Sequence, residues 1–302
     1  MIHSITVTNY LGDSLTLTLS RPEESGFIVM SVTGLGPAKA NINTTEISTN
    51  DGALYNSARV TSRNIVLSLR FLFDPTIEDV RQRSYKFFPI KREVTLVIET
   101  DNRRSRITGY VESNEPDIFS NEEGCEISII CPDPYFYDAS SDMNTSFSGV
   151  EPLFEFPFSN ESLTENLLEM SEIVDVPERV ILYQGDAEIG VTISIKAIGD
   201  AGDITIYNIT TEESMMISSS LIETLTGYGI KDKDEIIITT MTGNKSVTLL
   251  RDGIRTNILN CIDRNSDWFR LVKGENTFAY EATEGRNNLQ MVIENEIAYE
   301  GV

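Results

Sequence analysis

The chain contains a single histidine, His3, and this limits the chemistry that its side chains can perform. Serine and cysteine nucleophiles are usually activated by a histidine base, and most zinc sites include a histidine ligand. We expect His3, close to the first residue, to face solvent without a functional role. The sequence therefore predicts no enzyme, no cofactor and no metal site.

The three cysteines are an odd number, and their spacing does not fit a metal site. Cys125 and Cys131 lie on one predicted strand, where six residues of separation correspond to about 20 Å. A disulfide needs Cα atoms within about 7 Å of each other. We therefore expect these two cysteines and Cys261 to be buried, reduced thiols.

The segment from Gly34 to Pro37 has the closely spaced glycines of a phosphate-binding loop. However, Pro37 lacks a backbone N–H where such a loop needs a donor, and no Gly-Lys-Ser/Thr follows. We interpret the segment as a structural turn.

Several acidic residues near turns of the C-terminal half could supply calcium ligands, but their spacing does not match a Ca²⁺-binding loop. We expect them to be solvated carboxylates. They are Asp200, Asp203, Asp232, Asp234 and Glu235.

The formal net charge is −23, and it is uneven, with −6 on residues 1–138 and −17 on residues 139–302. Binding of nucleic acid requires a basic surface that releases counterions from phosphate, so we expect no specific nucleic-acid partner. A local basic cluster on a predicted helix indicates a solvated face or a protein contact. Its members are Arg81, Arg83, Lys86, Lys91 and Arg92.

The longest uninterrupted apolar runs, such as residues 27–30 and 180–183, are far shorter than the roughly 20 residues of a membrane-spanning helix. The first residues also lack the basic and apolar regions of a secretory signal. We therefore expect no membrane partner and folding in a cytoplasm.

The N-terminal half alternates apolar and polar residues in short segments, which predicts strands. One amphipathic helix is predicted from Asp74-Pro75, as N-cap and first turn, to a stop before Phe88-Pro89. Its apolar face contains Ile77, Val80, Ser84, Phe87 and Phe88. The predicted strands are 5–7, 15–19, 27–32, 64–73, 93–100, 104–111 and 125–131.

The C-terminal half reads as all-β, and its regular spacing of strands and turns predicts a sandwich or barrel. Residues 163–170 are equally compatible with a short helix and with a loop. The predicted strands are 153–158, 179–183, 191–197, 203–209, 214–218, 235–240, 246–250, 256–261, 268–272, 276–282 and 289–294.

Between the halves, Pro132 and Pro134 end a well-patterned strand, because proline cannot join a sheet ladder. The composition then becomes acidic and rich in turns. This break predicts two domains, 1–138 and 139–302, each of ordinary size.

Short stretches on both sides of this break occur in the order found in one protein family. They are residues 34–43, 51–55, 63–65 and 109–113, the break itself at 131–137, and then 234–238, 243–247, 266–271 and 274–276. Together they resemble the distal tail proteins of phages with long, non-contractile tails, and the resemblance covers nearly the whole chain.

The resemblance implies an all-β chain, with a tail-tube-like β-sandwich plus one helix in residues 1–138 and a galectin-like β-sandwich in residues 139–302. It also implies a structural protein of the virion tail tip, assembled in the host bacterial cytoplasm as a homo-hexameric ring. The implied partners are the tail tube protein, the tail-tip fibre or lysin protein, and receptor-binding or baseplate proteins. We expect residues 1–138 to form the ring interface, through edge strands and the 34–55 loop, at Gly34, Gly36, Pro37, Asn41, Asp51 and Tyr55.

Two other functions remain open. A galectin-like sandwich suggests a carbohydrate-binding adhesin, in which Trp268 would stack on a sugar and Arg270 would contact it. The galectin His-x-Asn-x-Arg motif is absent, however, and packing of Trp268 in a core or between domains is favoured. A glycan hydrolase needs only two carboxylates about 5–10 Å apart, so it is a distant third hypothesis in a chain with 47 acidic residues.

Overall fold

The structure is a computed structural model that describes residues 1–46, 51–73, 76–119, 122–140, 143–146, 148–152, 171–175 and 178–302. The chain divides into two compact units, and the second is inserted in the sequence of the first. Unit 1 contains Met1–Ser141 and Ala298–Val302, and unit 2 contains Asp142–Ile297. Residues 298–302, predicted to belong to the C-terminal domain, therefore lie in unit 1.

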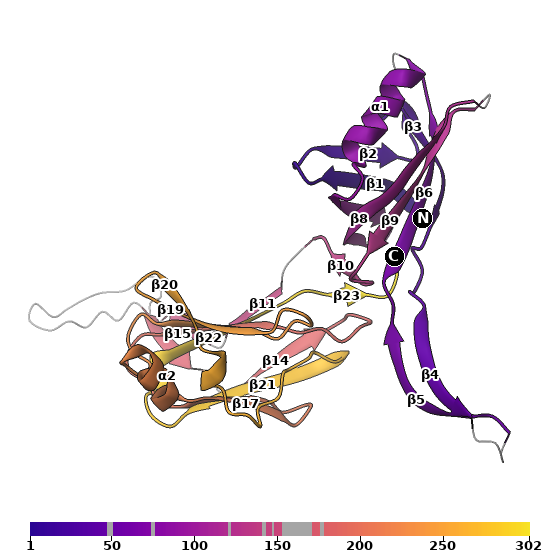
Figure 1. Cartoon of the computed structure of the whole chain (residues 1–302). Helices are drawn as coiled ribbons and strands as arrows, with labels where there is room; N and C mark the ends of the chain where they lie inside the picture. Colours follow the sequence, from indigo (N-terminus) through magenta and orange to yellow (C-terminus); the bar gives the residue numbers. More distant parts are fainter. Residues whose placement is uncertain are drawn as a thin grey trace, which may run out of the picture. The chain divides into compact units, whose positions relative to one another are not determined.

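Unit 1 is built on one antiparallel sheet with the strand order β2-β1-β7-β8-β9-β6-β3, to which β10 and β23 are added beside β8 (Figure 1). The edge strands β2 and β3 contact each other, so the curled sheet encloses a single core. The strands are β1 (Ile2–Asn9), β2 (Ser14–Thr18), β3 (Phe27–Thr33), β6 (Arg63–Phe71), β7 (Glu93–Thr100), β8 (Arg104–Asp117), β9 (Gly124–Cys131), β10 (Phe136–Asp138) and β23 (Ala298–Tyr299), and a 3-10 turn η1 spans Pro22–Glu24.

The core of unit 1 follows from the period-two patterning of these strands. Alternate residues of β6, namely Ile65, Leu67 and Leu69, are buried, as are Ile127 and Ile129 of the neighbouring β9. Successive side chains of a strand point to opposite faces, so one face of the sheet supplies the core. The strands predicted from this pattern are present.

Helix α1 (Ile77–Phe87) packs against β1 and β6 and buries Val80, Ser84 and Phe87, as its periodicity predicts. The N-cap is Thr76, whose Oγ1 accepts a hydrogen bond from the Asp79 N–H at 3.1 Å. The helix thus begins later than predicted, and the predicted cap at residues 74–75 lies outside the described residues.

The long predicted loop between β3 and β6 is instead a hairpin. Strands β4 (Ala40–Glu46) and β5 (Ala53–Val60) pair only with each other and extend away from the main sheet of unit 1 (Figure 1). We call this hairpin the arm.

Unit 2 contains two facing antiparallel sheets, as predicted for a β-sandwich (Figure 1). Buried residues from both sheets form its core, including Ile193 and Ile238 from one sheet and Ile206, Phe278 and Tyr280 from the other. The first sheet has the order β11 (Met143–Ser146), β22 (Leu289–Asn295), β15 (Thr192–Ala197), β18 (Glu235–Thr239), β19 (Ser246–Arg251), β20 (Ile254–Asn257), and the second β14 (Glu178–Tyr183), β21 (Gly274–Ala282), β16 (Ile204–Asn208), β17 (Glu213–Ile217). Strands β12 (Ser148–Pro152) and β13 (Ser171–Asp175) form a separate pair.

Several predictions for unit 2 are wrong in detail. A helix, α2 (Ser219–Thr226), follows β17 and was not predicted. The strand predicted at 256–261 is the end of β20 followed by a 3-10 turn, η2 (Leu259–Cys261), and that at 268–272 forms only an isolated bridge through Leu271. A further 3-10 turn, η3, spans Arg286–Asn288. The predicted strand at 153–158 and the segment 163–170 lie outside the described residues.

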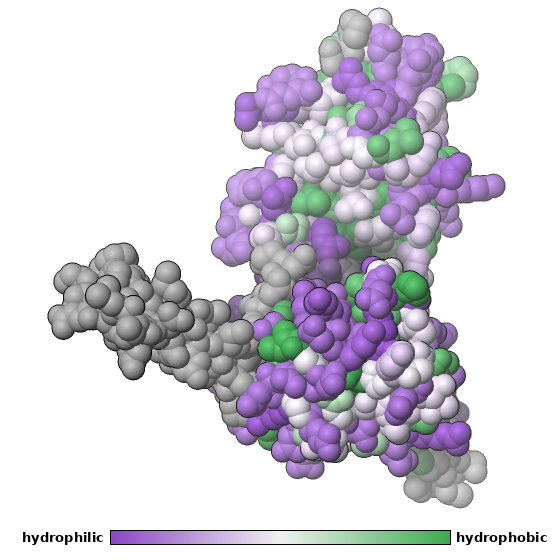
Figure 2. All heavy atoms as spheres, turned by 90° about the vertical axis from the view of Figure 1, so that its left-hand side faces the viewer, coloured by the Kyte–Doolittle hydropathy of each residue, from purple (hydrophilic) through white to green (hydrophobic). Residues whose placement is uncertain are grey.

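The surface is mostly hydrophilic on the face shown in Figure 2, where apolar side chains form small separate groups. Within the part of the chain that the structure describes, no helix is long and apolar enough to cross a membrane.

Candidate assembly surface

The arm exposes both of its strands. Every residue of β4 and of β5 is exposed, including Ile42, Leu54 and Tyr55, whose exposed fractions are 61%, 57% and 66%. An isolated two-stranded hairpin is marginally stable in water, because neither face is covered. Cover from a further surface would therefore stabilise the arm.

The two faces of the arm differ in polarity. Residues paired across the strands lie on the same face, and faces alternate along each strand except at a register shift between Asn43 and Thr44, where β5 contains one extra residue, Asn56. One face is mostly apolar and contains Ala40, Ile42, Thr44, Ala53, Tyr55, Ala58 and Val60, with Glu46 at its far end. The opposite face is mostly polar and contains Asn41, Asn43, Thr45, Leu54, Ser57 and Arg59. An apolar face at this spacing is typical of a docking surface.

The six residues predicted for a ring interface lie in or next to the arm. Asn41 is on the polar face, Tyr55 is on the apolar face, and Asp51 is exposed just before β5. Gly34, Gly36 and Pro37 lie in the segment between β3 and β4, which we call the arm root together with residues 61–62. No second chain is present, so their place in an interface stays a prediction.

Arg63, the first residue of β6, holds the arm root. It is 4% exposed, and its guanidinium donates only to backbone carbonyls. Nη1 donates to Gly34 O at 2.5 Å and to Gly36 O, and Nε donates to Pro134 O at 2.7 Å. Nη2 donates to Glu300 O at 2.6 Å. The Cζ atom lies 4.5 Å from the ring centroid of Phe136.

Burial lowers the pKa of Arg63, while the neighbouring Cys131 thiol group opposes this shift. Carbonyl dipoles and the Phe136 ring face compensate the buried charge. We call this arrangement the Arg63 clasp. Arg63 belongs to one of the stretches that carry the family resemblance, but its partners are remote in sequence, so its role could not be predicted.

Four members of the basic cluster, three on α1 and Arg92 after it, are engaged within unit 1. Arg81 pairs with Glu78 at 3.0 Å, Lys86 pairs with Asp13 at 2.9 Å, and Arg83 donates to Ser25 O at 2.9 Å. The Arg92 guanidinium lies over the Tyr10 ring, 5.1 Å from its centroid. These contacts favour the structural interpretation of the cluster over a phosphate-binding one.

The predicted glycan contact has a less open geometry than a sugar platform needs. Trp268 is partly buried, and the Lys245 ammonium group lies 5.1 Å from its ring centroid. Arg270 donates to Thr242 Oγ1 at 3.3 Å and lies 3.9 Å from a carboxylate oxygen of Glu188. The adjacent Phe269 is buried against Phe278. A sugar stacking on Trp268 would compete with Lys245 for that ring face.

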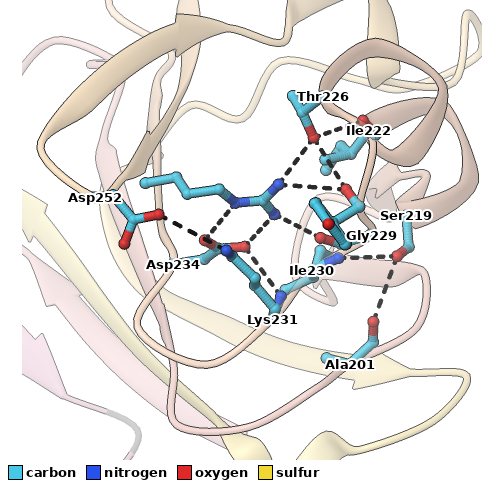
Figure 3. Close-up of polar contacts among 11 residues, drawn as sticks. Ala201, Ser219, Ile222, Thr226, Gly229, Ile230, Lys231, Asp234 and Asp252 are labelled. Atoms are coloured by element: carbon cyan, nitrogen blue, oxygen red, sulfur yellow. Dashed lines mark hydrogen bonds and ion pairs between the residues drawn. The ribbon is translucent and has the colours of Figure 1, made fainter.

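Asp234 is not the solvated carboxylate that was predicted. Its side chain is 1% exposed and accepts hydrogen bonds from Arg251 Nε at 2.8 Å and Arg251 Nη2 at 2.5 Å (Figure 3). The hydrogen bonds that the Arg251 side chain donates to Asp234 raise the pKa of Arg251. Arg251 also donates to Thr226 Oγ1 and Gly229 O, which fixes the end of α2. At the other end of α2, Asp203 accepts a hydrogen bond from the Ser219 N–H.

The cysteines are buried and unpaired, as predicted. Burial raises the pKa of Cys125 to about 12 and that of Cys131 to about 11, and it also raises that of Cys261. Because the thiolate is the reactive form, the folded thiols are unreactive at neutral pH. His3 lies near the surface with Nε2 2.6 Å from Asp101 Oδ1, and the hydrogen bonds that Asp101 accepts from the N-terminal amine and His3 lower the pKa of Asp101.

Comparisons with known proteins agree with this architecture. Residues 184–293 match the family described as "Siphovirus-type tail component, C-terminal domain". The crystal structure of the Dit (gp 19.1) protein of phage SPP1 is similar over 97% of this chain and 99% of that protein, with a TM-score of 0.63 and 15% identity. That protein is described as a paradigm of the hub adsorption apparatus in phages that infect Gram-positive bacteria. No curated protein matches the sequence.

Two structures of the phage p2 baseplate in its activated conformation, one with Ca and one with Sr, are weaker matches. Their TM-scores are 0.48 and 0.45 at 10% identity, covering 100% and 97% of both chains. The family match and the fold shared with SPP1 Dit confirm the resemblance to distal tail proteins and the predicted fold class.

Proposed function

We propose that this chain is a structural component of the tail tip of a phage, in which copies join into a closed ring through the arm. The family match over residues 184–293 and the Dit-like fold support a structural tail component. The observation that carries ring formation is the arm itself, an exposed hairpin with one apolar face. The proposed function includes no catalytic step.

The occupant of the apolar face is a second copy of this chain. In this proposal the arm contacts a part of the neighbouring copy other than its arm, so the contact between two copies is head-to-tail. Repeated head-to-tail contacts close into a ring when the rotation between copies permits it. The resemblance implies six copies in the ring.

In this proposal the ring joins the tail tube to the tail-tip fibre or lysin protein and carries receptor-binding or baseplate proteins. It forms in the host bacterial cytoplasm and becomes part of the virion. The presence of two separate units is consistent with this division, because unit 1 carries the arm and unit 2 leaves a second surface for other tail components.

The two faces of the arm provide the test. We expect Ile42→Asp and Tyr55→Asp in the full-length protein to abolish rings, because each places a charge on the apolar face. Ser57→Asp, on the opposite face of the same hairpin, is the matched control and is expected to preserve rings. The measurements are mass by light scattering and negative-stain imaging. A wild-type protein that stays monomeric at every concentration, or apolar-face variants that still form rings, would contradict the proposal.

A further inference from the structure

The arm is connected to the body of unit 1 by two short segments without regular structure. Residues 34–39 join β3 to β4, and residues 61–62 join β5 to β6. Thr61 N and Thr61 Oγ1 both donate to Lys39 O at 3.1 Å, which closes the hairpin on itself. These two hydrogen bonds close the base of the arm, but they do not fix the direction in which the arm leaves the sheet.

The Arg63 clasp connects the arm root to the body of unit 1 and so can fix this direction. Its guanidinium joins the arm root, through Gly34 O and Gly36 O, to Pro134 O and Glu300 O. These three segments are far apart in the sequence. A planar guanidinium presents its N–H groups in fixed directions, so it sets the relative positions of the carbonyls it binds.

The burial of this arginine needs a reason beyond packing. A buried cation is costly unless its hydrogen bonds are satisfied, and an apolar side chain of similar size usually fills such a space at least as well. The partners that the structure gives to Arg63 are carbonyls and an aromatic ring face, with no carboxylate among them. The site therefore selects a forked donor rather than an ion pair.

Residues 298–302 support the same connection from the other side. Strand β23 pairs with β10, where Phe136 lies opposite Tyr299, and Val302 N donates to Leu35 O at 3.1 Å. A side chain on Gly301 would lie 3.1 Å from Leu35 O, so this segment runs close to the arm root. The chain thus returns from unit 2 to lie against the arm root.

We propose that Arg63 is the positioning residue of the arm, and that with residues 300–302 it fixes the direction in which the arm leaves unit 1. Its importance for assembly rests on the ring function proposed above, but the direction of the arm can be measured without any ring. Arg63 does not itself contact the neighbouring copy in this proposal.

The test measures the distance between the arm and the sheet by pulsed electron spin resonance. Spin labels are attached to Asn43→Cys on the arm and Thr16→Cys on β2, both exposed positions. The native cysteines are buried, so the labels go to the introduced ones. An excess of unlabelled protein removes distances between copies. We expect one narrow distance distribution in the parent protein and at least a twofold broader one in Arg63→Met.

Arg63→Lys should also broaden the distribution, because one ammonium group cannot reach all four carbonyls. Arg59→Met, which removes an exposed arginine from the polar face of the arm, is the matched control and should leave the width unchanged. If Arg63→Met does not fold, a chain that ends at Tyr299 decides the question, because it loses Glu300 O and Val302 N and should broaden the distribution.

An unchanged width in the variant that folds would overturn the proposal. The two proposals fail separately. A parent protein without rings whose arm distance broadens in Arg63→Met refutes the ring but supports the clasp, whereas rings with an unchanged distance in Arg63→Met refute the clasp alone.

Discussion

Two glycines of the arm root, Gly34 and Gly36, look alike in the sequence but differ in the structure. Gly34 has a φ of +84°, and a Cβ there would lie 2.1 Å from Asn64 O. Gly36 has no positive φ, and a Cβ there would meet nothing within 4 Å. Backbone conformation, not exposure, therefore decides which of the two must be glycine.

We predict that Gly34→Ala lowers the free energy of unfolding of unit 1 by at least about 1–2 kcal/mol, because a left-handed alanine is strained and its methyl group collides with a carbonyl. Gly36→Ala should change it by less than about 0.5 kcal/mol. Urea unfolding followed by circular dichroism measures both. Equal effects of the two substitutions would show that the left-handed conformation at Gly34 does not matter.

Predictions at the scale of single residues succeed where the cause is local. The burial of Cys125 and Cys131 follows from their place in an alternating strand, and the structure confirms it. Arg63 was not identified as buried, and Arg251 was not identified as the partner of Asp234, because the groups that they contact lie far away in the sequence. Asp234 was misread for the same reason, since only the fold brings Arg251 to it.

Helix α2 depends on a network that joins it to β19 and the following turn. Arg251 binds Asp234 and Thr226 Oγ1, and Thr226 Oγ1 in turn donates to Ile222 O (Figure 3). The helix has only eight residues, too few to be stable alone. Tertiary contacts therefore maintain it.

We predict that Asp234→Ala destabilises unit 2 by about 3–5 kcal/mol, because it leaves the Arg251 guanidinium largely buried without its carboxylate. Arg251→Met should lower the free energy of unfolding by less in the Asp234→Ala background than in the parent protein. A double-mutant cycle, measured by thermal or urea unfolding, gives this difference. The exposed pair Lys196–Glu235, 3.7 Å apart, is the control, and Glu235→Ala should cost at most about 1 kcal/mol. If Asp234→Ala lowers the free energy of unfolding by no more than the control Glu235→Ala does, a structural role for the Asp234–Arg251 pair is contradicted.

At the scale of elements, strands with strict alternation were predicted well, and segments without it were not. The arm was predicted as a loop because both its faces are exposed, so burial imposes no alternation on β4 and β5. Residues 268–272 look like a strand, but Phe269 and Leu271 are buried core residues in an extended loop. Local composition does not separate such a loop from a strand.

The charge of the whole molecule bears on the proposed ring, whose six copies would carry a formal charge of −138, six times −23. A ring through which a genome passes benefits from walls that do not bind phosphate. The field is screened within about 8 Å at physiological salt, so only side chains that face the pore act directly. The basic residues of α1 already contact groups of unit 1.

We predict that the pore is acidic or neutral and that the assembled protein does not bind double-stranded DNA at physiological salt. Fluorescence anisotropy with labelled DNA measures binding, and an experimental structure of the ring locates the charges. A pore lined mainly by Arg81, Arg83, Lys86 and Arg92 would refute this prediction, as would salt-sensitive binding of DNA by the ring.

The fold class of the whole chain could be predicted from the sequence, because short stretches on both sides of the proline-rich break occur in the same order as in distal tail proteins. The return of residues 298–302 to unit 1 could not be predicted, because β23 has only two residues and is too short to show an alternation of apolar and polar residues. Residues 1–138 expressed alone would therefore lack β23 and the fourth carbonyl bound by Arg63.

This return also sets a sequence of events during synthesis. The ribosome adds residues in order, so residues 142–297 are complete before residues 298–302 are made. Unit 1 therefore lacks β23 and the carbonyl of Glu300 until every residue of unit 2 has been made. A nascent copy thus has an arm whose root is held by fewer contacts than in the finished chain. In the proposed ring, a copy would therefore gain the full set of contacts at its arm root only after residues 298–302 have been made.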